Sequence, residues 1–198
     1  MNFLVIGSGA REHIITEKLS FSGSPVYSVL TNLNPGILDI SAASHSVNDY
    51  HSNISKRSIM EFASEHSVNC VVIGPEDPLA HGLSDMFWKQ DIPVVGPTQN
   101  LAQIESSKGF TRDLLNKYSI RASPLYKRFK NMNGASEFID ELGDDFVIKF
   151  DGLMGGKGVK LSGEHLSSKS EALEYCKKII DNSGIFVIEE KMFGEEFS

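Results

Sequence analysis

Short apolar runs that end directly in glycine-containing loops constrain the first half of this 198-residue sequence more than any other feature. Residues 3–6 and 70–73 are continuously apolar, and 93–95 is a shorter run of the same kind. A run without polar alternation is typical of a strand that is buried on both faces of a parallel sheet. Because helical patterns separate the runs, the sequence predicts an α/β fold with helices on both faces of the sheet.

We expect residues 1–98 to form one Rossmann-like domain. In such sheets, ligands bind where the loops leave the carboxyl ends of the strands. Three loops occupy this position, at residues 7–12, 74–78 and 96–98. The sequence therefore predicts a ligand site at this edge.

A second unit follows a predicted helical connector at residues 99–122. Residues 123–198 show the order strand, helix, strand, loop, strand, helix, strand. This order predicts a small α+β lobe.

The loop at residues 149–158 carries the strongest chemical signal in the second unit. Lys149 ends an apolar strand, and four glycines and Lys157 follow within nine residues. Glycines let backbone N–H groups approach a phosphate, and lysines supply point charges. The GxxxxGK[ST] order of a Walker A loop is absent. A plain hairpin turn with solvated lysines is the alternative, but Lys149 shares a strand face with Val147, a place that favours an anionic partner.

A second polar cluster follows the last apolar strand, which begins at Phe186. Glu189 and Glu190 come directly after apolar residues, and Gly194 and two further glutamates follow a few residues later. Taken alone, this pattern predicts a strand and an acidic, solvated turn. Together with the strand of Lys149, forty residues earlier, it favours a nucleotide site.

Six motifs in the same order resemble one family of enzymes. VIKFDGLMGGKGV (147–159) and VIEEKMFGEE (187–196) resemble the nucleotide half of the ATP-grasp fold. The other four narrow the resemblance to the phosphoribosylamine–glycine ligase family, over essentially the whole chain. They are IGSGAREH (6–13), IGPEDPL (73–79), VGPT (95–98) and ESSKGF (105–110).

The resemblance implies a ligase that joins glycine to 5-phosphoribosylamine with ATP and Mg²⁺ (or Mn²⁺). ATP would phosphorylate the glycine carboxylate, and the amine would then attack the acyl phosphate. Such chemistry depends on positioning and on neutralising phosphate charge.

The resemblance also assigns residues to ATP. They are Lys108 and Lys149 for the phosphates or adenine, Gly155, Gly156, Lys157 and Gly158 for a flexible cover over the triphosphate, Glu189 for the adenine amino group, Glu190 to Met192 for backbone contacts at the hinge, and Glu196 for the ribose.

The first domain offers two interpretations of its glycine turn. A dinucleotide fingerprint requires a third glycine where Glu12 stands, and residues 30–32 contain no acid for an NAD ribose, so NAD binding is disfavoured. Arg11 and the N-terminus of the following helix suit the phosphate of a phosphosugar. The predicted substrate-binding residues are Gly9, Arg11, Glu12, Pro35, Gly36, Gly74, Pro75 and Glu76.

Charge and cysteine usage limit the partners and the compartment. The net charge of −7 argues against nucleic-acid binding. Cys70 and Cys176 are outside any CxxC pair, and the first residues resemble neither a signal peptide nor a membrane span. We expect a cytoplasmic protein with small-molecule substrates, two reduced thiols and no membrane partner.

In the resembled family the polypeptide continues for about as long again, and the later part supplies the magnesium ligands. We therefore expect an ATP-grasp lobe that is incomplete at its C-terminus and a chain that is inactive alone. It would be a fragment, a relict, or one half of a pair with a separate chain. The alternatives are another ATP-grasp carboxylate–amine ligase and a non-catalytic module that binds phosphosugar or nucleotide.

Overall fold

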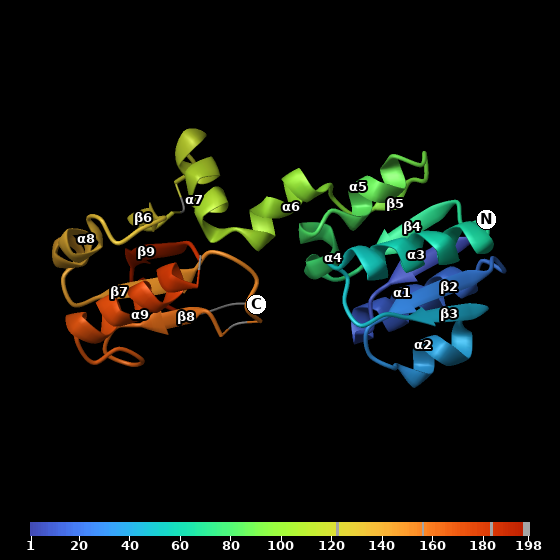
Figure 1. Cartoon of the computed structure of the whole chain (residues 1–198), viewed down its shortest axis with the longest axis horizontal. Helices are drawn as coiled ribbons and strands as arrows, with labels where there is room; N and C mark the ends of the chain where they lie inside the picture. Colours follow the sequence, from blue (N-terminus) through green and yellow to red (C-terminus); the bar gives the residue numbers. More distant parts are fainter. Residues whose placement is uncertain (122, 156, 183, 196–198) are drawn as a thin grey trace. The chain divides into compact units, whose positions relative to one another are not determined.

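The computed structural model describes residues 1–121, 123–155, 157–182 and 184–195. It divides into two compact units, Met1–Ala102 and Gln103–Ser198 (Figure 1). The helix α6 (Gln99–Ser106) spans the division.

The first unit is built on a five-stranded parallel sheet with the order β3-β2-β1-β4-β5. The chain starts in the centre and winds first to one side and then to the other, which is the Rossmann arrangement. The strands are β1 (Phe3–Ile6), β2 (Val26–Leu30), β3 (Ala43–Ser46), β4 (Cys70–Ile73) and β5 (Val94–Val95). The parallel sheet that the apolar runs predict is confirmed.

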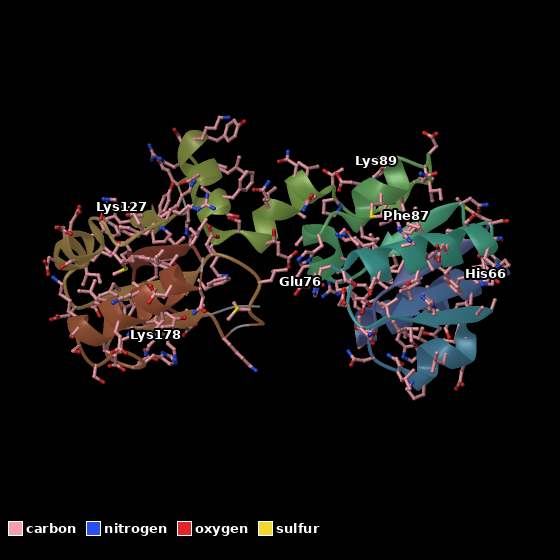
Figure 2. The ribbon with its side chains drawn as sticks, in the orientation of Figure 1. His66, Glu76, Phe87, Lys89, Lys127 and Lys178 are labelled. Carbon is pink, nitrogen blue, oxygen red and sulfur yellow. The ribbon has the colours of Figure 1, made fainter. Side chains whose placement is uncertain are left out.

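Helices bury both faces of this sheet. Leu4 and Ile6 pack in one core with Ile59 and Phe87, and Figure 2 labels Phe87 on α5. Val5, which points to the opposite face, is fully buried on the side of α1. The helices are α1 (Ala10–Ser20), α2 (Pro35–Ile40), α3 (Asn53–Glu65), α4 (Glu76–Ala80) and α5 (Leu83–Trp88).

Residues 81–90 carry a helical pattern in the sequence, and the observed helix α5 lies within this range. A second short helix, α4, begins at Glu76, within the loop predicted at residues 74–78. Gly82 separates the two helices with a left-handed conformation (φ of 77°).

The second unit contains a four-stranded antiparallel sheet with the order β6-β9-β7-β8. Its strands are β6 (Tyr126–Phe129), β7 (Phe146–Phe150), β8 (Val159–Leu161) and β9 (Phe186–Glu190). Its helices beyond α6 are α7 (Lys108–Lys117), α8 (Ala135–Leu142) and α9 (Lys169–Asp181). The predicted small α+β lobe is confirmed.

The two faces of this sheet differ in chemistry. Phe146, Ile148, Phe186 and Ile188 point to the face that α8 and α9 cover, and they form the core of the unit. Alternation along the strands places Lys149 and Glu189 on the opposite face. The helix α7 packs against β6 and β9.

In the described part of the chain, no helix combines the length and the apolar character that crossing a membrane requires.

Candidate functional site

Glu189 is a buried carboxylate on β9 that pairs with two cations. Its residue is only 3% exposed. Val147 lies opposite Glu189 in the sheet, so Lys149 is its diagonal neighbour on the same face. The Lys149 ammonium contacts Oε1 of Glu189, and Arg112 of α7 donates its Nε–H to Oε2 over 2.9 Å. Both oxygens of the carboxylate are therefore engaged.

Asp151 is a second buried carboxylate, directly after β7, with a fully buried side chain. Its Oδ2 lies 2.8 Å from Nε of Arg128 on β6. Its Oδ1 accepts hydrogen bonds from the Ser107 hydroxyl (2.9 Å) and the Gly109 amide (3.0 Å). The carboxylate thus ties the start of α7 to the end of β7.

Gly109 makes this close approach possible. A Cβ atom at this position would lie 2.5 Å from Cδ of Arg128 and 2.7 Å from Oδ2 of Asp151. A side chain at position 109 would therefore displace the Arg128 and Asp151 side chains or move α7 away from them.

Lys108 lies at the first position of α7 and donates from its ammonium to the carbonyl of Gly152 over 3.0 Å. Burial lowers the pKa of Lys108, and the attraction of Asp151 opposes this shift. The positive charge of Lys149 lowers the pKa further. An anion beside Lys108 would oppose the effects of burial and of Lys149 on this pKa, since it stabilises the charged form of the ammonium.

Cations outnumber buried carboxylates at this end of the lobe. Arg128 also lies 3.8 Å from the exposed Asp113, but among the described residues of this lobe the side chains of Asp151 and Glu189 are the buried carboxylates. The surplus is local, because the whole chain has a net charge of −7. A partly buried positive surplus of this kind favours an anionic ligand. The four cations are Lys108, Arg112, Arg128 and Lys149.

The glycine-rich loop connects β7 to β8. Gly155 has a φ of 52° and open space where a side chain would stand. The amide of Lys157 donates to the carbonyl of Met154 (3.0 Å), and the amide of Phe150 donates to Gly158 (2.7 Å). The segment is thus a hairpin, and its role as a cover over a triphosphate stays a prediction. Gly156 and Glu196 lie outside the described residues.

The predicted hinge follows β9. Glu190 accepts from the Leu125 amide (3.0 Å), and its own amide donates to the Leu125 carbonyl (2.9 Å). The Lys191 amide donates to Asp145 (3.0 Å), whereas Met192 is 71% exposed. A backbone contact to adenine at the hinge stays a prediction and rests mainly on Met192.

Glu12 organises the carboxyl edge of the sheet in the first unit. It is 4% exposed, and its Oε2 accepts from the Gly9 amide at 2.7 Å. A Cβ at Gly74 would lie 2.0 Å from Oε1 of Glu12, and one at Gly7 would lie 2.5 Å from its Cγ. The glutamate therefore fills the space between the loops after β1 and β4.

Arg11 borders the same carboxylate, with its Nε 3.9 Å from Oε1 of Glu12. The Arg11 guanidinium donates to the Gly74 carbonyl at 3.0 Å and is otherwise exposed. Pro75 precedes α4, and Glu76 opens its first turn, as Figure 2 shows at its label.

The loop after β2 also meets the glycine turn. The Asn34 side chain donates to the Ser8 carbonyl (3.0 Å), and the Ser8 hydroxyl accepts from the Thr31 amide (3.0 Å). A Cβ at Gly36 would lie 2.1 Å from the ring of His13, so this histidine packs against the segment Pro35–Gly36. The predicted substrate-binding residues thus lie along one edge; their contacts with a substrate stay a prediction.

Sequence reasoning missed Arg112, Arg128 and Asp151. One signal was available for Arg112, because it lies four residues after Lys108 and therefore on the same face of a helix. No comparable signal links Arg128 to Asp151, because a strand, a helix and two loops separate them.

No magnesium ligands can be assigned here. Among the described residues, no group of three or more His, Cys, Asp or Glu side chains lies close enough together to hold a metal ion. The two buried carboxylates of the second unit are already paired with arginine or lysine.

A Rossmann unit followed by an antiparallel lobe with a strand-borne lysine and a glycine-rich hairpin defines the ATP-grasp class. The N-domain model of phosphoribosylglycinamide synthetase matches residues 1–105, and the ATP-grasp (A) domain model of the same enzyme matches 106–198. The chain belongs to the phosphoribosylglycinamide synthetase family, which confirms the resemblance seen in the six motifs.

Relatives and solved structures agree with this assignment. Phosphoribosylamine–glycine ligases of Methanobrevibacter smithii and Methanococcus maripaludis are 41% and 44% identical to this chain; each alignment covers all of it but only 45% and 46% of the relative. The chain thus spans about half the length of these relatives.

Two crystal structures show the same fold. Phosphoribosylamine–glycine ligase from Thermotoga maritima matches with a TM-score of 0.72 and 25% identity, over 98% of this chain and 45% of that one. The ADP complex of an N5-carboxyaminoimidazole ribonucleotide synthetase also reaches 0.72, over 96% of this chain and 47% of that one. At 15% identity, the latter shows the fold alone.

Proposed function

We propose that this chain provides the phosphosugar-binding and part of the ATP-binding machinery of a ligase that joins glycine to 5-phosphoribosylamine. The observation that carries the proposal is the surplus of cations around Glu189 and Asp151 in an otherwise acidic chain. Family membership supplies the identity of the substrates.

In the proposed reaction the γ-phosphoryl group of ATP passes to the glycine carboxylate and leaves ADP and glycyl phosphate. The amine of phosphoribosylamine attacks the acyl carbon, and inorganic phosphate leaves with the electron pair of the broken C–O bond. Lys108 and Lys149 would hold the polyphosphate, and the hairpin through Gly155, Lys157 and Gly158 would exclude water from it. The amino group of adenine would donate to Glu189, whose carboxylate has lone pairs beyond those that its two cations use.

The phosphosugar would bind at the carboxyl edge of the parallel sheet. Arg11 is the exposed cation of this edge, and Glu12 is its buried anion. We propose that Arg11 meets the phosphate, while Glu12 and Glu76 meet the amine or the ribose hydroxyls. This arrangement brings the substrate phosphate to the positive guanidinium and keeps it away from the two carboxylates.

Mg²⁺ or Mn²⁺ belongs to the proposal through the family resemblance only. Because the described residues do not fit a metal ion, no step is assigned to one. The partner that supplies metal ligands would be a further stretch of polypeptide or a separate chain. A cytoplasmic location agrees with the free thiols of Cys70 and Cys176.

A non-catalytic binding module is the second candidate function, because the cations around Glu189 and the exposed Arg11 would bind nucleotide and phosphosugar without any further chemistry. Another ATP-grasp ligase is disfavoured, because relatives at 39–44% identity are named phosphoribosylamine–glycine ligases.

Calorimetry with ATP and with ribose 5-phosphate tests the proposal. Both ligands should bind to the 198-residue chain, and Lys149→Met should weaken only the binding of ATP. The chain alone should form no glycinamide ribonucleotide from ATP, glycine and phosphoribosylamine. Product formation would exclude the binding module, and failure to bind ATP would exclude the nucleotide site.

A further inference from the structure

The contacts of Glu189 leave one positive charge in excess. If Lys149 were its only partner, the buried carboxylate and the ammonium would form a neutral pair. Arg112 occupies the second oxygen at 2.9 Å and brings the three side chains to a net charge of +1. The two cations do not compete for one oxygen, since Lys149 contacts Oε1 and Arg112 contacts Oε2.

We propose that Arg112 is a positioning residue for Lys149: by sharing the carboxylate of Glu189, it releases the ammonium to bind the polyphosphate of a nucleoside triphosphate. The inference rests on the proposed function, because it names a group that prepares the same site.

The location of Arg112 suits this role. It lies one helical turn after Lys108, and Asp151 fixes the start of α7 through Ser107 and Gly109. The guanidinium is therefore held in place before any nucleotide binds. An arginine also stays charged throughout the accessible pH range and tolerates burial better than a lysine.

Two other roles for Arg112 make different predictions. If Arg112 contacts the phosphates directly, Arg112→Met should lower the affinity equally with glutamate or glutamine at position 189. As a purely structural residue, it would change stability, and Glu189→Gln would not restore the affinity that Arg112→Met loses. A double-mutant cycle with Glu189 separates the three roles.

The cycle measures the affinity of the 198-residue chain for ATP and for inorganic tripolyphosphate by calorimetry at low ionic strength. Arg112→Met should weaken both by about tenfold, because Glu189 then holds Lys149 in a neutral pair. The decisive ligand is tripolyphosphate, because it has no adenine for residue 189 to bind. The double variant Arg112→Met/Glu189→Gln should bind tripolyphosphate within about threefold of the original affinity, since the net charge of the three positions is again +1. A double variant that binds tripolyphosphate as weakly as Arg112→Met, or more weakly, overturns the inference.

Two further variants guard against trivial outcomes. Arg112→Lys keeps the charge and should retain most of the affinity. If Arg112→Lys lost as much affinity as Arg112→Met, the role of Arg112 would be structural. Lys178→Met with Glu174→Gln removes a similar pair on the surface of α9, where Figure 2 labels Lys178. This control should change affinity by less than about twofold, because exposed pairs contribute little.

A readout without nucleotide keeps this inference separate from the proposed function. The rate at which an uncharged succinimidyl ester acylates Lys149, measured by peptide mass spectrometry, should fall in Arg112→Met and recover in the double variant. If the chain binds neither ATP nor tripolyphosphate, the proposed nucleotide site is wrong, and the acylation rates still decide the role of Arg112. Equal rates in the original chain and in Arg112→Met would refute it.

Discussion

At the scale of single residues, buried charges in the second unit decide both stability and binding. Asp151 has no exposed side-chain surface and holds Arg128, Ser107 and Gly109 at once. Its removal would leave the Arg128 guanidinium with only the exposed Asp113 as a counter-ion, at 3.8 Å, and the start of α7 without these hydrogen bonds.

We expect Asp151→Asn to lower the free energy of unfolding by about 2–3 kcal/mol. Breaking one partner of a buried pair costs about 3–5 kcal/mol, and the partial exposure of Arg128 reduces this cost. Urea denaturation followed by circular dichroism measures the change. Asp140→Asn is the matched control, because Asp140 pairs with Lys169 on the surface and should contribute less than about 1 kcal/mol. Equal effects of the two variants would contradict the importance of burial.

Because of Lys108, the affinity for ATP should begin to fall at a lower pH than it would with an exposed lysine. Burial lowers its pKa below the ordinary 10.5, so the folded protein loses this positive charge before an exposed lysine would. A bound polyphosphate favours the protonated form, and therefore affinity should fall as pH rises through the lowered pKa. Calorimetry between pH 7 and about pH 10 measures the fall, an accessible range below the pKa of arginine. Lys108→Arg should abolish it, because a guanidinium stays protonated; an unchanged profile would assign the dependence to another group.

At the scale of elements, Glu12 explains why the loops after β1 and β4 carry glycine. Its carboxylate takes the space that Cβ atoms at Gly7 and Gly74 would need. The usual third glycine of a dinucleotide turn lets a helix and a strand pack closely. Here a buried side chain stands at that position and joins two loops.

Gly74→Ala should destabilise the first unit by about 1–3 kcal/mol, because its Cβ would stand 2.0 Å from Oε1 of Glu12. In Glu12→Ala the obstacle is gone, so adding Gly74→Ala to that variant should cost less than about 0.5 kcal/mol more. Thermal unfolding of the four proteins checks this non-additivity. Additive losses would show that the glycine is required for another reason.

The sequence predicted the elements whose own residues carry the signal. Cys70–Ile73 is apolar throughout and was expected as a strand, whereas Ala43–Ser46 was missed because an edge strand with alternating polar residues resembles a loop. The helix Pro35–Ile40 was missed because Asn34 and Pro35 also begin turns. The site shows the same limit. Lys149 was predicted from its strand, but its pairing with Glu189 depends on sheet register, and Arg112 lies 77 residues from Glu189 in the chain.

At the scale of the whole molecule, the chain divides into two units with separate cores. The first core is centred on the parallel sheet, and the second lies between the antiparallel sheet and the helices α8 and α9. Each unit buries its own apolar residues, which is what independent folding requires.

Calorimetric unfolding should therefore show two transitions. Asp151→Asn should lower only the transition of the second unit, and Gly74→Ala only that of the first. A shift of about 4–8 °C per kcal/mol is expected for units of about 100 residues. A single transition that moves with both variants would show that the units unfold together.

The tie between Asp151 and the start of α7 has a consequence for how this family can vary. Lys108 and Arg112 stand one turn apart on a helix whose first residues are clamped to the end of β7. The positions of the two side chains therefore depend on the same helix. A substitution on the outer side of α7 that tilts the helix would move both cations, although the substituted residue would contact no ligand. In such relatives the affinity for a nucleotide would change because of substitutions on α7, while the residues that line the site stayed the same.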